Sequence, residues 1–164
     1  MKIRTSLLTF IGALALVGCQ STSGPDQASA EGRTDKQRFI EADRVATECS
    51  AKSFVTPSGQ VVSQQIIFLS RDTATNEKLM ASTSRLSGQQ KLALREYLAE
   101  NLKCREAFFA GLDGTAYYAV FARYFSTMDD VYVKLLTDQI TIGQANTAKA
   151  KAIRDTAAEV SRFQ

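Results

Sequence analysis

The chain has 164 residues, of which 45% are apolar and 23% are charged, the range of a folded globular protein rather than a disordered one. It contains 20 Lys and Arg against 17 Asp and Glu, and it has no His. The absence of His excludes Ser-His-Asp catalysis, Cys-His catalysis and His-ligated zinc. The length accommodates one domain with a core of modest size.

The first twenty residues predict a secretory signal. A basic start, Met1 to Arg4, precedes an almost unbroken apolar run from Leu7 to Val17. As a helix this run is about 16 Å long, well short of the roughly 30 Å hydrocarbon core that a spanning segment crosses. We therefore interpret it as a cleaved signal rather than a membrane span. It ends in Leu16-Val17-Gly18-Cys19, which resembles the lipobox of bacterial lipoprotein signal peptides.

This resemblance implies that residues 1–18 are removed and that Cys19 becomes the lipidated first residue. The expected modification is a diacylglyceryl thioether on Cys19 and a further acyl chain, such as palmitate, on its amino group. Two or three acyl chains anchor a protein stably, whereas one binds only marginally. Gln20 rather than Asp follows the Cys. By the sorting rule for such lipoproteins, this implies the outer membrane, with the protein facing the periplasm.

Removal of the signal also lowers the net positive charge of the expected mature chain. Lys2 and Arg4 leave with it, so 18 positive and 17 negative side chains remain of the 20 and 17 in the whole chain. This near balance gives no electrostatic reason to expect nucleic acid as a partner.

Two of the three Cys remain once Cys19 carries lipid, namely Cys49 and Cys104. An oxidising periplasm favours a disulfide between them. In the chain-entropy model, closing a loop of about 55 residues stabilises the fold by roughly 4 kcal/mol. The alternative is a reactive thiol pair, which neither a C-x-x-C motif nor adjacent positive charge supports.

Residues 19–35 are expected to form a lipidated flexible tether, since no aliphatic side chain larger than Ala occurs from Gln20 to Asp35. A domain over 36–164 follows. Its first helix begins at Lys36, and Thr56-Pro57-Ser58-Gly59 predicts the turn that ends it. The apolar face of that helix is expected to comprise Phe39, Ala42, Val45, Ala46 and Cys49.

Helix and strand signals conflict from 54 to 85. The segment 61–70, VVSQQIIFLS, is rich in β-branched residues, yet we interpret it as helix because no partner strand is evident elsewhere. Residues 73–85 predict a short helix or a loop.

The next predicted helix begins at Ser87 and Gln90, which match a capping box, and Gly111 and Gly114 are expected to end it. Cys104 lies on the flank of its apolar stripe with Tyr97 and Phe108, where it can meet Cys49. The stripe itself is Leu94, Leu98, Leu102, Phe109 and Leu112.

The clearest helix is predicted over 115–136. Its inward face comprises Tyr117, Phe121, Tyr124, Met128, Val131, Tyr132 and Leu135.

A second capping box, Thr141 with Gln144, predicts a last helix that runs to about Arg162. The preceding pattern Leu135-Leu136-x-x-Gln139-Ile140-Thr141 resembles the short helix-turn-helix tails of many bacterial proteins, which implies a local hairpin and a role in homo-oligomerisation. The inward side chains expected on the last helix are Ile142, Ala145, Ile153, Ala157 and Val160. The fold class is therefore all-α: an antiparallel bundle of four or five helices with one disulfide.

Eight of the fourteen aromatic residues lie between Phe108 and Tyr132. Their helical spacing favours an ordinary core, and the alternative is a groove for an apolar ligand, an acyl chain or a partner helix. The groove would use Tyr117, Tyr118, Phe121 and Phe125.

Arg105 and Lys149 lie in the middle of apolar stripes, beside Asn101 and Asn146. We expect both cations to extend to the rim of the domain, since a buried charge is costly unless it is paired. The alternative is a polar pocket or an interface that includes them. Asp129 and Asp130 are expected on a solvated face rather than in a catalytic pair. No sequence motif points to a metal or a cofactor.

The function expected from these features is that of a non-catalytic envelope lipoprotein that scaffolds or escorts another envelope protein. The architecture looks like that of the pilotins of secretion systems, small lipoproteins that hold a partner segment in an apolar groove. The alternatives are a binder of a small apolar ligand or lipid and, less favoured, an envelope enzyme or enzyme inhibitor.

Overall fold

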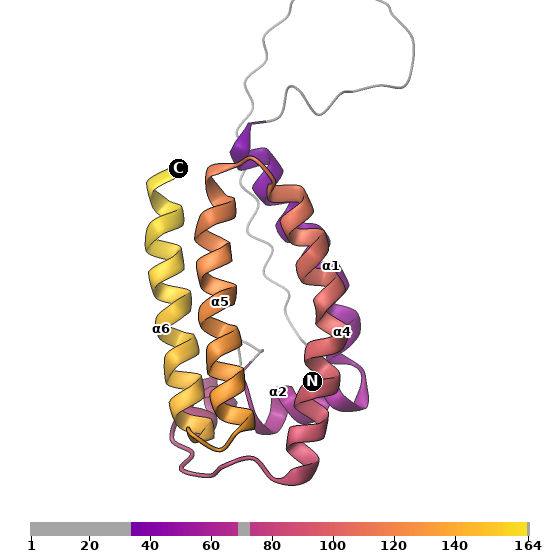
Figure 1. Cartoon of the computed structure of the whole chain (residues 1–164), viewed down its shortest axis with the longest axis vertical. Coiled ribbons are helices and arrows are strands. Elements are labelled where there is room, and N and C mark those ends of the chain that lie inside the picture. The colour runs from indigo at the N-terminus through magenta and orange to yellow at the C-terminus, as the bar shows by residue number, and fades with distance from the viewer. Residues whose placement is uncertain (1–33, 69–72, 164) are drawn as a thin grey trace, which may run out of the picture. The chain divides into compact units, whose positions relative to one another are not determined.

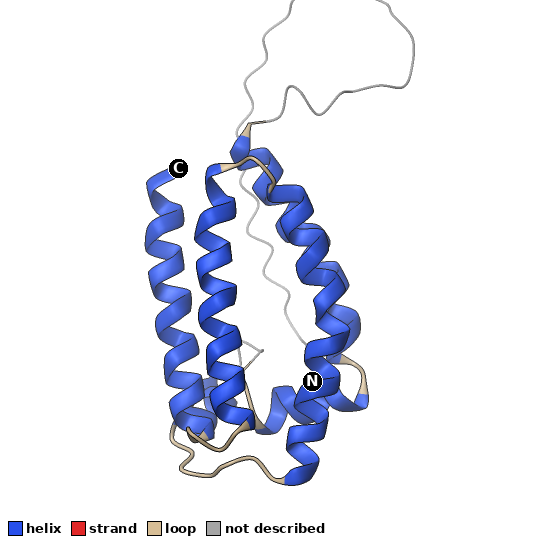
Figure 2. Cartoon of the chain, in the orientation of Figure 1, coloured by secondary structure: helices blue, strands red, loops and turns tan. Residues whose placement is uncertain are grey.

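The computed structural model describes residues 34–68 and 73–163. The expected signal peptide, Cys19 and the tether as far as residue 33 lie outside the described residues. Within the described ranges the secondary structure is entirely helical, with loops between helices (Figure 2). The prediction of an all-α bundle with one disulfide is confirmed. None of the described helices has an apolar stretch long enough to cross a bilayer.

Six α-helices account for these ranges, more than the four or five expected, because the segment with conflicting signals forms two short helices. They are α1 (Asp35–Phe54), α2 (Pro57–Gln65), α3 (Thr73–Met80), α4 (Gly88–Leu112), α5 (Ala116–Leu136) and α6 (Ile142–Val160). A single 3-10 turn, Ser161–Phe163, follows α6.

Side-chain caps set where the helices begin. Both predicted capping boxes are present: the Ser87 hydroxyl accepts from Gln90 N at 3.2 Å, and Thr141 and Gln144 make the equivalent pair. The amide oxygen of each Gln accepts in return from the backbone N–H of the capping residue. These bonds satisfy N–H groups that a helix start otherwise leaves unpaired.

The segment Thr56-Pro57-Ser58-Gly59 was expected to be a turn and instead begins α2. Pro57 occupies the first turn of the helix, and the Thr56 hydroxyl accepts from Gly59 N at 3.1 Å. Proline is favourable there because the N–H groups of the first turn have no acceptor within the helix, so the N–H that proline lacks is not missed by the helical hydrogen bonding. Only glycine fits at position 59, since a Cβ would lie 1.9 Å from the Ser53 carbonyl oxygen.

The long helices associate in two pairs, α1 with α4 and α5 with α6 (Figure 1). The Cys49–Cys104 disulfide joins the first pair, with 5.4 Å between the two Cα atoms, as predicted. Gly111 was expected from sequence to end α4. In the structure it lies inside that helix. A Cβ at Gly111 would lie 2.7 Å from the Ala42 Cβ, so this glycine allows α1 to approach α4 closely.

The buried face of α4 agrees with the predicted stripe in part, since Leu94 and Leu112 are fully buried. Tyr97, Cys104 and Phe108, expected on its flank, are also buried, whereas Leu102 is 52% exposed. The reason is that α1 covers the other side: its Cys49 bonds to Cys104, and the Phe54 ring stacks on Tyr97 at 6.3 Å between centroids.

The face predicted for α6 is also partly wrong. Ile153 is 41% exposed and Ala157 is exposed, while the polar residues Asn146 and Lys149 are buried. The residues buried on α6 therefore include polar side chains that find hydrogen-bond partners, as well as residues of the apolar pattern. The remaining buried residues of this helix are Ile142, Gly143, Ala145 and Ala152.

Candidate binding groove

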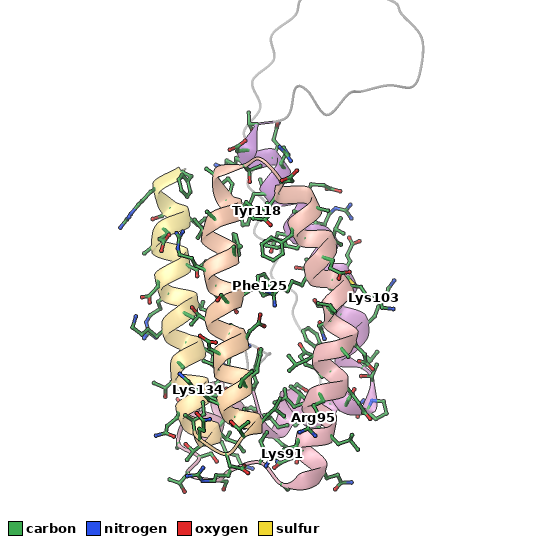
Figure 3. The ribbon with its side chains drawn as sticks, in the orientation of Figure 1. Lys91, Arg95, Lys103, Tyr118, Phe125 and Lys134 are labelled. Atoms are coloured by element: carbon green, nitrogen blue, oxygen red, sulfur yellow. A yellow bond between two sulfur atoms is a disulfide. The ribbon has the colours of Figure 1, made fainter. Side chains whose placement is uncertain are left out.

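A groove of about 640 Å³ lies between α4 and α5. Most of its lining is apolar or aromatic. Figure 3 shows Phe125 extending from α5 into the space that faces α4, whereas Lys103 of α4 points away from that space. The wall from α4 includes Tyr97, Leu98, Asn101, Leu102, Cys104, Arg105 and Phe108, and the wall from α5 includes Tyr124, Phe125, Met128, Asp129, Tyr132, Val133 and Leu136. Lys149 of α6 and Ala46 and Ser50 of α1 complete it.

Three of the six predicted groove residues line this space together: Phe125, Arg105 and Lys149. Tyr118, in contrast, is 42% exposed and packs against the Phe109 ring at 5.1 Å between centroids.

Tyr117 and Phe121 belong to the core. The Tyr117 side chain is 1% exposed, and its ring stacks on Phe39 at 4.7 Å. Phe121 lies between Phe39 at 5.4 Å and Phe108 at 4.9 Å. The predicted aromatic cluster is therefore divided, with one end of α5 filling the core and the middle lining the groove.

An ion pair joins the two walls. Arg105 of α4 donates from Nη1 to the two carboxylate oxygens of Asp129 of α5, at 2.9 and 2.7 Å. The guanidinium also lies over the Phe125 ring, 4.7 Å from its centre. Asp129 lies on a solvated face, as expected, and its side chain is 53% exposed. The sequence analysis did not foresee that it pairs with Arg105 across the groove. Both are partly exposed, so the pair contributes little to stability.

Lys149 is the buried cation of the groove. Its side chain is 7% exposed, and its ammonium donates to the Phe68 carbonyl oxygen at 2.7 Å. The ammonium also lies 4.8 Å from the centre of the Phe68 ring. Burial lowers the pKa of Lys149 to about 8. The expectation that this lysine extends to the rim is wrong.

Asn146, one turn before Lys149, explains why polar residues occupy this face of α6. Its side chain accepts from Phe68 N at 2.9 Å and donates to the carbonyl oxygens of Ile66 and Ile142, at 2.7 and 2.8 Å. Asn146 is fully buried, so these bonds satisfy an amide that would otherwise be costly to bury. Together Asn146 and Lys149 hold the chain that leaves α2.

Three tyrosines belong to the lining, Tyr97, Tyr124 and Tyr132. Burial raises the pKa of Tyr97, Tyr124 and Tyr132, and neighbouring tyrosines raise it further for Tyr97 and Tyr132. These phenols stay neutral at physiological pH and can donate hydrogen bonds.

Several lining residues were not recognised from sequence as belonging to a groove. Leu98, Met128 and Tyr132 were assigned to the core stripes, and Leu102 was assigned there too. Val133 is 58% exposed, on the opposite wall from Leu102. A signal that could have revealed the groove is the excess of apolar residues around α4, more than a single buried face requires.

The chain matches no protein-family model, no curated protein and no solved structure. Over residues 34–68 and 73–163, no three His, Cys, Asp or Glu side chains gather in a way that could hold a metal ion. The class is thus defined by fold and site alone: a disulfide-linked helical bundle with a largely apolar groove whose lining includes a buried lysine.

Proposed function

We propose that this protein is a non-catalytic lipoprotein of the bacterial envelope, anchored through Cys19 in the outer membrane, that binds an apolar ligand in the groove between α4 and α5. The observation that carries the proposal is the groove itself. Its volume of about 640 Å³ falls within the range of roughly 300–1,000 Å³ typical of small-molecule sites. Its apolar walls, with a few polar groups, are also typical of such sites.

The polar groups of the groove favour binding over catalysis. General acid–base catalysis requires groups that face a reacting atom and are free to exchange a proton. Here Arg105 and Asp129 bond to each other, and Lys149 bonds to a backbone carbonyl.

The envelope location rests on the lipobox, and the disulfide supports it. Disulfides persist in the periplasm and are rare in reducing compartments. Substitution Cys19→Ala should remove the protein from the outer membrane, because no acyl chain can then be attached. Retention of the variant in the outer membrane would contradict anchoring at this residue.

A second candidate function is the one first expected, a scaffold or escort for another envelope protein, similar to a pilotin. The exposure of the groove rim favours it. Leu102 on one wall is 52% exposed and Val133 on the other is 58% exposed. An amphipathic partner helix in the groove would bury both side chains.

Site-specific photocrosslinking in intact cells distinguishes the two functions. A photoreactive amino acid at Leu102 or Val133 reports on the groove, and the same amino acid at Lys103, which points away from it, is the control. A low-mass lipid adduct formed only from the groove positions would support ligand binding. One protein captured only from those positions would support the escort function instead. Equal products from Lys103, or none, would contradict both.

A further inference from the structure

Lys149 is an unusual residue to find in an apolar groove. Burying an ammonium costs free energy unless hydrogen bonds and a counter-charge compensate it. Within residues 34–68 and 73–163, Lys149 makes one hydrogen bond, to the Phe68 carbonyl oxygen, out of the three that an ammonium can donate. Within the described ranges no carboxylate forms an ion pair with it. The groove therefore contains a charge that the described protein does not neutralise.

The other charges of the groove are already paired. Arg105 already donates from Nη1 to both oxygens of Asp129, so an anionic ligand there would compete with that carboxylate. Lys149 is a compact point charge, which suits one small anionic group rather than a planar bidentate one.

Holding Phe68 does not by itself require a charge at position 149. A neutral donor of similar length can bond the Phe68 carbonyl oxygen without the desolvation cost of an ammonium. Asn146 already bonds the Phe68 N–H. Among the described contacts, the one that uses the charge of Lys149 is the cation–π contact with the Phe68 ring at 4.8 Å, and a ring supplies no counter-charge.

We propose that the groove binds a long-chain carboxylate, an unesterified fatty acid, whose acyl chain lies between the apolar walls of α4 and α5 and whose carboxylate accepts hydrogen bonds from Lys149. This inference rests on the proposed function, because it names the ligand class of the same groove. The chain would contact Leu98, Met128, Tyr132 and Leu136, which all line the space. A carboxylate on Lys149 supplies the counter-charge, and the acyl chain covers the apolar walls.

The protonation state of Lys149 is consistent with this. Its pKa of about 8 leaves the amine mostly protonated at neutral pH. An adjacent carboxylate favours the charged form and raises that pKa.

The test uses membranes that contain the acylated full-length protein. They are photolabelled with a diazirine-bearing palmitate and, separately, with the matching hexadecanol probe, which lacks the carboxylate. We expect the palmitate probe to label peptides of α4 and α5. Substitution Lys149→Gln, which retains a donor for the Phe68 carbonyl, should reduce that labelling at least tenfold while leaving labelling by the alcohol unchanged.

The matched control is Lys151→Gln. Lys151 is an exposed lysine on the same helix that pairs with Asp155, and it does not line the groove. It should leave labelling by both probes unchanged. A second measurement needs no variant at all: in the wild type, unlabelled palmitate should displace the palmitate probe at a concentration at least tenfold lower than its methyl ester.

Two other results are informative in different ways. Equal labelling of the groove by both probes, insensitive to Lys149→Gln, with palmitate and its ester competing equally, would overturn the carboxylate inference and retain the apolar groove. Absence of groove labelling by either probe would overturn the inference and the proposed function together.

Discussion

The ammonium of Lys149 on α6 donates a hydrogen bond to the carbonyl oxygen of Phe68 at 2.7 Å, in the segment that leaves α2. The same charge lies 4.8 Å from the centre of the Phe68 ring, within the range of a cation–π contact. A charged residue thereby connects two distant parts of the chain while facing an apolar groove. This relationship connects the stability of the fold to the binding site.

The first prediction concerns the pH dependence of unfolding. Burial lowers the pKa of Lys149 to about 8, against roughly 10.4 in an unfolded chain. Between these two values the unfolded state binds more protons, so the free energy of unfolding should rise with pH from about 8 to about 10, by at most about 1.4 kcal/mol per pH unit. Above about 10 the trend should reverse, because the buried tyrosines keep their protons in the fold.

Urea denaturation at a series of pH values measures this profile. The variant Lys149→Met has no group to titrate at this position, so its stability should lack the rise between pH 8 and 10. The same rise in Lys149→Met as in the wild type would show that another group causes it.

The second prediction separates the core aromatics from those of the groove. Phe121 packs between the rings of Phe39 and Phe108, so Phe121→Ala should lower the free energy of unfolding by about 3–5 kcal/mol. Phe125 lines the groove, and Phe125→Ala should cost less stability yet weaken ligand binding. Chemical denaturation and photolabelling of the two variants measure both effects. Equal loss of stability in the two would contradict the division of the aromatic cluster.

The third prediction concerns the contact between α1 and α4. A Cβ at Gly111 would lie 2.7 Å from that of Ala42, so Gly111→Ala should destabilise the fold by about 1–3 kcal/mol through overpacking. Gly88, in the first turn of the same helix, has nothing within 4 Å of such a Cβ. Gly88→Ala should therefore leave the thermal midpoint unchanged or raise it. If both substitutions shift the midpoint alike, the close approach of the two helices is not required.

Signals between residues close in the sequence, together with the cysteine count, predicted several features of the fold correctly. The capping boxes at Ser87 and Thr141 were identified correctly because each depends on two residues three positions apart. The pairing of Cys49 with Cys104 followed from the cysteine count and the expected compartment.

Features that depend on contacts distant in sequence were not predictable. Asn146 and Lys149 are buried because their partners are backbone groups of residues 66–68, which no helical periodicity reveals. Leu102 was assigned to the core because it is apolar, yet α1 covers the other side of α4. A pattern of apolar residues therefore predicts that a helix is amphipathic, but not which part of a wide apolar face remains open.

The groove can be blocked without disturbing the core. Leu102→Glu places a charge on the groove rim at a side chain that is already 52% exposed. Its matched control is Leu92→Glu, on the same helix, where the side chain is 56% exposed and does not line the groove. Both variants should fold as the wild type does, because neither loses buried contacts.

Native mass spectrometry of the protein, released gently from membranes of the cells that produce it, tests the central claim most directly. We predict a complex of one chain with one apolar molecule in the wild type and in Leu92→Glu, and its loss in Leu102→Glu. A wild-type chain that carries no ligand and acquires none when palmitate is added would contradict the account.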